Sequence, residues 1–427
     1  MVTMQTFDTA LKDIYEEPLR DQINTGSGIF LAKVEQTSKD IEGGRRVYKI
    51  APYGVNGGTG SGSDTQALPV SGGNLYAPFI SGIKSIRGVI KFTDQVMKAS
   101  RSSKAAFLSA MESEQDGLLK SAKFTYGRQS YLDGTGICTK CCGDITSDNN
   151  RTVVNVESTQ YLIEGMIIDI VDTRTNAPIQ KGGEHRRIVA VNRIGNQKSI
   201  VLDGTTDVSD LTTTSDFSAS NLVIVEQGSY KQELTGMEAV FAQSGSLYGL
   251  DKSKNPWLVP YRRDLKTVKE DQTTGNQIEE KGAIDDQTIV DTINFVEEYR
   301  GSNINLLIAN PAVESEYYRY LAATKRYVNT TTIEGGYKSL SVAGRPMVKD
   351  RFVKPGCLKL LDTTQWKMHT LDGGDWSWLD EDGKILKWVS NFAMWTAVLI
   401  KYCELICDHP GGQAEIVNIA TASNLFG

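Results

Sequence analysis

Three of the six cysteines of this 427-residue chain lie within five positions, in the stretch YLDGTGICTKCCGD. Cys138, Cys141 and Cys142 show the CxxC spacing that zinc knuckles and redox pairs share. A structural zinc site needs four ligands, and the second cysteine group, CELICDH at 403–409, lies far along the chain in an apolar strand or helix. A thioredoxin-like pair opens a helix, whereas these cysteines stand between glycines. We therefore expect small, buried or half-buried thiols where one domain gives way to the next, and no metal ligand.

Other candidate sites have the wrong residues at the required positions. The glycine run at 54–64 is not followed by Lys-Ser or Lys-Thr, so it does not match a phosphate-binding loop. The acidic stretch LDEDG at 379–383 does not fit a calcium loop, because its alignment places Trp378 at the first ligand position. The three histidines occur in no HExxH motif, and no GxSxG is present. We predict no catalytic, cofactor-binding or metal-binding residue, although a triad assembled from distant residues stays open.

Composition narrows the function classes further. The chain carries 46 Lys and Arg against 52 Asp and Glu, a formal net charge of −6. This balance argues against a protein whose main task is to bind duplex DNA, although it permits local contacts. The first residues do not form a secretion signal, and no stretch reaches the roughly 20 apolar residues of a membrane helix. We expect a soluble protein made in a reducing cytoplasm.

The first third of the chain predicts long, simple elements. Apolar residues at helical spacing predict a short amphipathic helix over 8–22, followed by an extended connector over 26–44. The strands RRVYKIAPY and YAPFISGIKSIRGVIKF flank a small, polar tip at about 54–74, which predicts a long hairpin. Loops of this length serve binding or are disordered. Residues 102–130 then predict one long helix.

The predicted secondary structure changes twice in the remainder of the chain. Between 143 and 235 five β-rich runs separated by turns predict a small barrel or sandwich inserted in the chain. A helix over 287–300, the buried strand INLLIA and a second helix from Asn310-Pro311 predict an α/β layer, since Asn is a good N-cap and proline suits the first helical turn. The end of the chain is rich in strands, with Asp382-Gly383 as a hairpin turn.

The order of these elements resembles that of the major capsid proteins of tailed bacteriophages, whose shell-forming fold is shared with encapsulins. The likeness spans nearly the whole chain, and the order of its pieces makes it specific. The stretches that carry it are LKDIYEEPLRDQINTGSGIF at 11–30, YLDGTG at 131–136, MEAVFAQSGSLYGLDKSKNPW at 237–257, LLIANPAVESEYY at 306–318 and GRPMVKDRFVKPGCLKLLD at 344–362.

The resemblance implies an α+β chain in which an arm and an extended loop reach over neighbouring subunits and an inserted β-barrel-like domain lies on the outer surface. It divides the chain into an N-terminal arm (1–44), an extended hairpin loop (45–93), the spine helix of a peripheral domain (94–142), the inserted β-rich domain (143–235), a mainly axial α/β domain (236–357) and a strand-rich end (358–427).

The implied function is that of a structural protein and not an enzyme: the subunit of an icosahedral virion shell, assembled in the host cytoplasm. Its implied partners are copies of itself in pentamers and hexamers, double-stranded DNA packaged without sequence specificity, scaffold and portal proteins, and a decoration protein. No cofactor and no membrane are implied. The alternatives are an encapsulin-like compartment, which usually lacks so large an insertion, and a cytoplasmic enzyme with a β-rich accessory domain.

Some members of this family join their subunits by an isopeptide bond from a lysine in the distal part of the extended loop. Here no lysine occurs between Lys49 and Lys84, and both lie near the base of the expected hairpin. We therefore predict a shell held by non-covalent contacts alone.

Overall fold

The protein is described from a computed structural model. The described residues are 22–24, 26–64, 67–95, 104–148, 151–179, 183–194, 197–204, 221–270, 277–324, 330–332, 338–371, 373–380, 384–390 and 392–421. The helix expected over 8–22 lies outside these residues except for its last position, Gln22, which is helical. The turn expected at Asp382-Gly383 also lies outside them.

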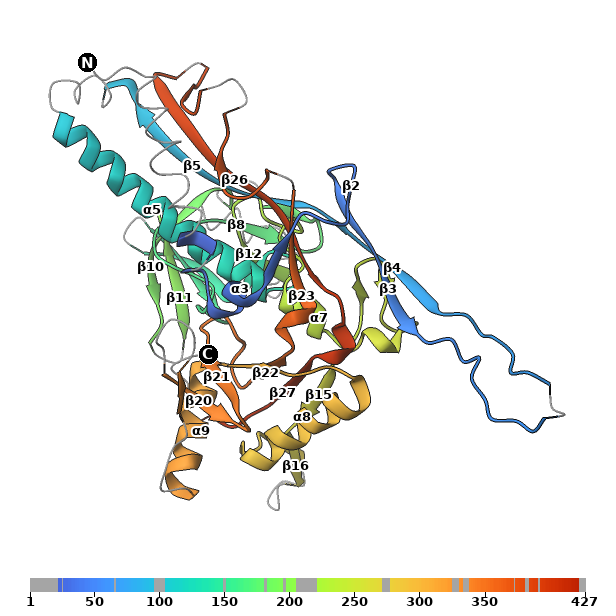
Figure 1. The fold of residues 1–427 in the computed structure, drawn as a ribbon. Coiled ribbons are helices and arrows are strands. Elements are labelled where there is room, and N and C mark those ends of the chain that lie inside the picture. The colour runs from blue at the N-terminus through green and yellow to red at the C-terminus, as the bar shows by residue number, and fades with distance from the viewer. Residues whose placement is uncertain are drawn as a thin grey trace.

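The body contains two large hydrophobic cores. One is shared by a six-stranded sheet, the long helix α5 (Lys104–Tyr131) and a strand-rich module, and the other lies under helices α8 (Asp286–Arg300) and α9 (Pro311–Thr324). In Figure 1 the module and α5 lie beside the upper sheet, whereas α8 and α9 lie at the opposite end of the molecule. A hairpin projects sideways from between them.

The six-stranded sheet is organised around β26 (Met394–Cys407), which pairs along ten residues with β5 (Lys84–Thr93). Its other strands are β1 (Glu35–Thr37), β23 (Trp366–Thr370), β24 (Ser377–Trp378) and β25 (Lys387–Trp388). The sheet therefore joins strands from the two ends of the chain. Helix α5 covers one face of β5, where a Cβ on Gly88 would lie 2.6 Å from a methyl group of Leu118.

The module is a sheet whose strand order closes on itself. The order is β10 (Arg186–Asn192), β11 (Lys198–Leu202), β7 (Arg151–Val156), β6 (Ile137–Asp148), β12 (Leu222–Glu226), β8 (Ile167–Asp172) and β9 (Ala177–Pro178). A further pairing of β10 with β8 completes a ring of strands. Closure removes the free sheet edges of those strands, so the barrel-like alternative of the sequence prediction is the one that the structure adopts.

The second core lies under a sheet with the order β15 (Tyr261–Asp264), β27 (Ala414–Val417), β22 (Leu358–Leu361), β18 (Leu306–Ala309), β21 (Arg345–Lys349), β20 (Lys338–Val342) and β19 (Thr330–Thr332). The predicted N-cap of α9 is confirmed, because Asn310 Oδ1 accepts a hydrogen bond from the backbone N–H of Ala312 at 3.0 Å. Asp285 caps α8 in the same way, through the N–H of Thr288 at 2.8 Å.

Three sequence expectations need correction. The connector expected over 26–44 contains a short helix, α3 (Ile29–Lys33), because Phe30 and Leu31 are drawn into the core. The return stretch of the hairpin is two strands: β4 (Leu75–Gly82) pairs with β3 (Arg46–Gly54), whereas β5 continues into the sheet of β26. The boundary expected between 142 and 143 falls inside β6, since β12 already pairs with residues 137–140.

Candidate assembly surface

The hairpin β3–β4 has one face that the body covers. Val47, Ala51 and Phe79 are buried on this face. The ring of Trp257 stacks on Tyr53 with centroids 4.9 Å apart and on Phe79 at 6.0 Å. These contacts hold the base of the hairpin against the body.

A polar clamp reinforces this base. Lys49 Nζ lies 2.7 Å from Asp408 Oδ2, and both side chains are largely buried. The backbone N–H of Ile80 donates to the carbonyl of Tyr248 at 3.0 Å. The position of the hairpin is therefore fixed by contacts from within the chain.

The opposite face of the same strands is apolar and uncovered. Side chains alternate across a strand, and the strand register places Tyr48 opposite Ile80, Ile50 opposite Pro78 and Pro52 opposite Tyr76. Ile50 is 57% exposed and Tyr76 is 58% exposed. We call these six residues the outer face of the hairpin.

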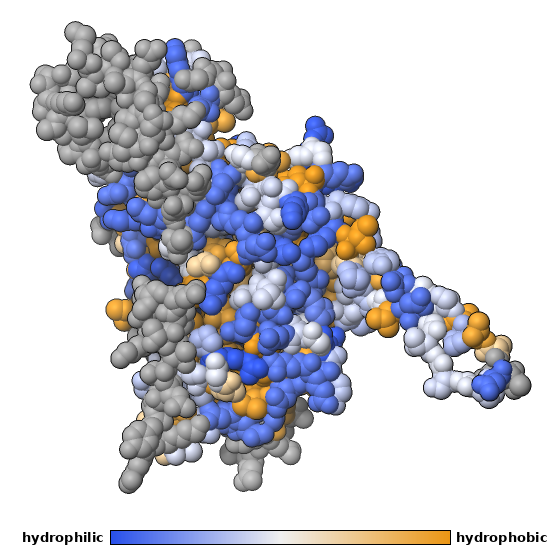
Figure 2. Space-filling model, in the orientation of Figure 1, coloured by the Kyte–Doolittle hydropathy of each residue, from blue (hydrophilic) through white to orange (hydrophobic). Residues whose placement is uncertain are grey.

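The hairpin is also where exposed apolar residues concentrate. Nine of the eighteen large exposed hydrophobic side chains of the described residues lie between 48 and 80. Figure 2 shows hydrophobic residues along the projecting hairpin, which stands clear of the body. An apolar surface that no described residue of the chain covers is typical of an interaction site.

The tip of the hairpin has little internal structure. The Asn56 side chain joins its two arms: Oδ1 accepts from the backbone N–H groups of Gly58 at 3.0 Å and Gly72 at 3.2 Å. Val55, Leu68 and Val70 are each about nine-tenths exposed. The described part of the run 54–74 shows no strand or helix between Gly54 and Leu75.

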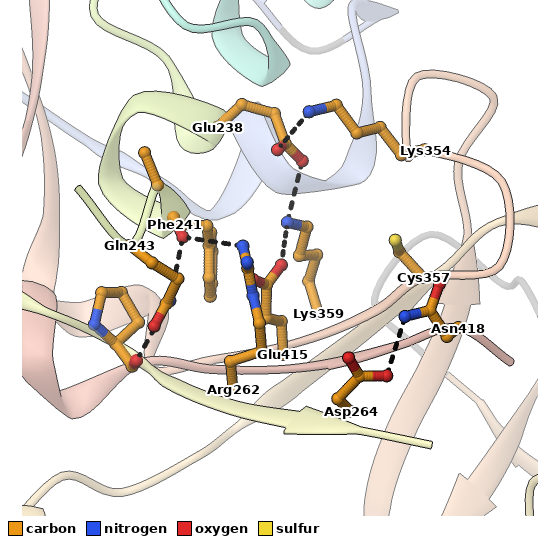
Figure 3. Close-up of polar contacts among 12 residues, drawn as sticks. Glu238, Phe241, Gln243, Arg262, Asp264, Lys354, Cys357, Lys359, Glu415 and Asn418 are labelled. Atoms are coloured by element: carbon orange, nitrogen blue, oxygen red, sulfur yellow. Dashed lines mark hydrogen bonds and ion pairs between the residues drawn. The ribbon is translucent and has the colours of Figure 1, made fainter. Parts of the chain in front are cut away.

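A chain of ion pairs with a buried centre and partly exposed ends links the two cores (Figure 3). Glu238, on α7 (Met237–Phe241), lies 2.8 Å from both Lys354 Nζ and Lys359 Nζ. Lys359, on β22, also lies 2.6 Å from Glu415, on β27. Arg262, on β15, completes the chain with its Nε 2.5 Å from Glu415. We call these five residues the junction network.

The charges of the junction network stabilise one another. Burial alone would raise the pKa of Glu238, but the two neighbouring lysines lower it to about 2. Burial would likewise lower the pKa of Lys359, but Glu238 and Glu415 raise it above its usual value. Lys359 also lies 4.2 Å above the ring of Phe241. These groups stay ionised because each has opposite charges within contact distance.

The clustered cysteines lie on strand β6 and not at the start of a helix. Cys138 and Cys141 are buried and Cys142 is exposed, and all three are free thiols. Burial raises the pKa of Cys138 and of Cys141 to about 12. A protonated thiol is a poor nucleophile and a poor metal ligand, and Cys138 Sγ instead faces Arg128 at 3.3 Å.

The second cysteine group and the histidines lie on separate elements. Cys403 and Cys407 are buried on β26. His369 is on β23, His409 precedes a short helical turn, and His185 lies beside Asp169 near the barrel. Within the described ranges, no group of three His, Cys, Asp or Glu side chains is placed to hold a metal ion. None of the helices in the described part of the chain is both long enough and apolar enough to cross a membrane.

Sequence reasoning missed the junction network. Its members are separated by up to 177 positions, from Glu238 to Glu415, and no local pattern marks them. The alternating strand pattern could have suggested the outer face of the hairpin, but both faces of β3 carry apolar residues. Burial on one face is decided by Trp257 and Tyr248, which lie far along the chain.

Solved structures share the architecture of this chain. It matches the capsid asymmetric unit of cyanophage A-1(L) with a TM-score of 0.53 at 10% identity, over 95% of this chain and 93% of that chain. It also matches the SrpI encapsulin of Synechococcus elongatus PCC 7942, at a TM-score of 0.45, 10% identity and 91% and 86% coverage. A third match is the procapsid of satellite phage P4, at 0.43, 11% identity and 95% and 90% coverage.

No protein-family model and no curated protein sequence matches the chain. The match to the cyanophage capsid nevertheless covers nearly all of both chains, so it concerns the whole architecture and not one shared module. The α+β fold of this chain is therefore the phage capsid fold that the cyanophage structure shares with it.

Proposed function

We propose that the chain is the major capsid protein of a tailed bacteriophage, which assembles into a closed icosahedral shell around double-stranded DNA. The observation that carries the proposal is the outer face of the hairpin: an apolar surface, held away from the body, that the described part of this chain leaves uncovered. A second subunit is the natural cover, because closed assemblies bury the same surface in every copy.

The regions would take the following roles. The hairpin and the N-terminal segment reach over neighbouring subunits, α5 forms the spine of a peripheral domain, and the sheet with α8 and α9 forms the axial domain of pentamers and hexamers. The barrel is an inserted domain on the outer surface. The role is structural and not enzymatic, and the protein resides in the virion after assembly in the host cytoplasm.

Partners follow from the same proposal. Packaged DNA is contacted only locally and without sequence specificity, because a net charge of −6 does not favour extensive binding to duplex DNA. Scaffold and portal proteins, and a decoration protein on the outside, complete the particle. No cofactor and no membrane take part.

Negative-stain microscopy of the purified protein tests the proposal. We expect closed icosahedral particles, and nuclease-protected DNA in particles taken from infected cells. Closed particles that contain a protein cargo and no nucleic acid would favour the encapsulin-like alternative. A chain that stays monomeric at all concentrations, with or without a scaffold partner, would contradict shell formation.

A further inference from the structure

Strand β5 has a free edge. Among the described strands it pairs with β26 and with no other strand, although it is ten residues long. An unpaired edge presents backbone N–H and C=O groups that can accept another strand. Helix α5 packs against β5, and none of the described strands pairs with the edge that β26 leaves free.

A cleft of about 790 Å³ opens along this strand. One wall is the backbone and side chains of 83–87 with Val89, and the other walls come from α5 and from the end of β12 with its following turn. The cleft therefore exposes successive residues of β5 together with a facing wall, which is the shape that an added strand requires.

Positive charge gathers in the cleft. Arg45, Lys84 and Arg87 line it, and none of them forms an ion pair with another residue in the described part of the chain. The one carboxylate in its lining, Glu226, is already bound to Arg128 at 2.6 Å. Lys84 also lies near the buried Glu404. The cleft thus offers the positive charges of Arg45 and Arg87 to an incoming ligand, together with that of Lys84 beside Glu404.

A buried polar atom in the cleft has no partner. Gln129 lines the cleft, is only 5% exposed, and its Oε1 accepts no hydrogen bond within the described part of the chain. Buried amides are normally satisfied, and an incoming N–H group would satisfy this one. The free edge, the cations and this amide lie in one cleft, and an extended acidic peptide could interact with all three.

We propose that this cleft binds an extended, acidic segment of a different protein, which adds as a strand to β5 and places its carboxylates on Arg45, Lys84 and Arg87. Every described strand of this chain is already paired within one of its own sheets, including β17 (Gln277–Glu280) with its Glu279 and Glu280. The inference does not rest on shell formation, because it concerns the free subunit.

The probe is a fluorescent peptide of alternating valine and glutamate, titrated against free full-length subunits. We expect saturable binding, and slower hydrogen exchange at the amides of 84–89. Arg87→Glu should weaken binding at least about tenfold, since it replaces an attraction by a repulsion. Lys91→Glu is the matched control: it makes the same charge change on the same strand, outside the cleft, and should leave binding unchanged.

Four further measurements separate the alternatives. A peptide with lysine in place of glutamate, and one with alternate backbone nitrogens methylated, should both fail to bind. Equal binding of the methylated peptide would overturn strand addition. Stronger competition by a single-stranded oligonucleotide would overturn a peptide ligand, and concentration-dependent protection of 84–89 in the protein alone would show that a second copy is the occupant. Arg45→Glu repeats the test should Arg87→Glu not fold.

Discussion

The junction network and the outer face of the hairpin differ in whether their side chains find partners within the same chain. At the junction, the largely buried Glu238, Lys359 and Glu415 pair with one another, and the partly exposed Lys354 and Arg262 complete the network. On the hairpin, apolar side chains that could be buried are held in solvent. The first region is complete within one chain, whereas we propose that another molecule covers the second.

This difference gives each region a distinct kind of sensitivity. A change at the junction should destabilise the free subunit, because it removes a counter-charge from a buried group. A change on the outer face should leave the subunit folded and remove its ability to assemble. Substitutions in the two regions should therefore separate assembly from folding.

Ile50→Asp should abolish closed particles. Full burial of an isoleucine side chain contributes about 1.5–3 kcal/mol. This contribution is lost in every copy of the shell, and the aspartate also places a carboxylate in the contact, where its burial is unfavourable. The free subunit should unfold within about 0.5 kcal/mol of wild type, as surface substitutions do. Microscopy measures assembly, and denaturant unfolding of the free subunit measures stability.

Ile194→Asp is the matched control for that change, since Ile194 is 79% exposed on the barrel and away from the hairpin. It should leave particles intact. Normal particles from the Ile50→Asp variant would show that the outer face is not an assembly contact.

Lys359→Met should destabilise the free subunit by about 3–5 kcal/mol, because Glu238 and Glu415 then lose a buried counter-charge. The control is Lys349→Met, whose lysine is 66% exposed and lies 3.4 Å from Glu314. This pair should contribute at most about 1 kcal/mol. Equal unfolding midpoints for the two variants would contradict a stabilising junction.

Glu404→Gln should flatten the dependence of stability on pH. Burial raises the pKa of Glu404 to about 7, from 4.5, and its Oε2 has no partner within the described part of the chain. A raised pKa favours the neutral form, so its stabilisation is full below pH 4.5 and is lost as pH rises through 7, by about 3 kcal/mol. The variant should lose this slope, and the exposed Glu157→Gln should retain it. An unchanged slope in Glu404→Gln would assign the dependence to other groups.

Mature particles boiled in detergent should give one band near 46.9 kDa. The hairpin tip has no lysine, and Lys49 at its base is engaged by Asp408. Multimers that survive detergent and reductant would contradict a non-covalent shell and direct attention to Lys49 or Lys84.

Local patterns in the sequence predicted much of the fold. The β-branched runs at 151–156 and 222–226 are strands, and Asn310-Pro311 starts a helix as expected. Long-range pairing was beyond such patterns: β5 joins β26 about three hundred residues later, so the expected hairpin was drawn too long. The boundary at 143 was misplaced for the same reason, since the start of β6 is defined by β12.

The candidate site was predictable only in part. The glycine-rich tip identified the hairpin, but the exposed face of β3 depends on Trp257 and Tyr248 packing against the other face. The junction network depends on sheet order, which places Lys359 beside Glu415. Neither the covered face of the hairpin nor the order of the strands can be predicted from a short stretch of sequence.

A side-chain-resolution reconstruction of the assembled particle tests the central claim most directly. The account predicts that Tyr48, Ile50, Tyr76 and Ile80 are covered by a second subunit, while the junction network keeps the contacts that it has in one chain. An outer face that remains open to solvent in a closed shell would contradict it.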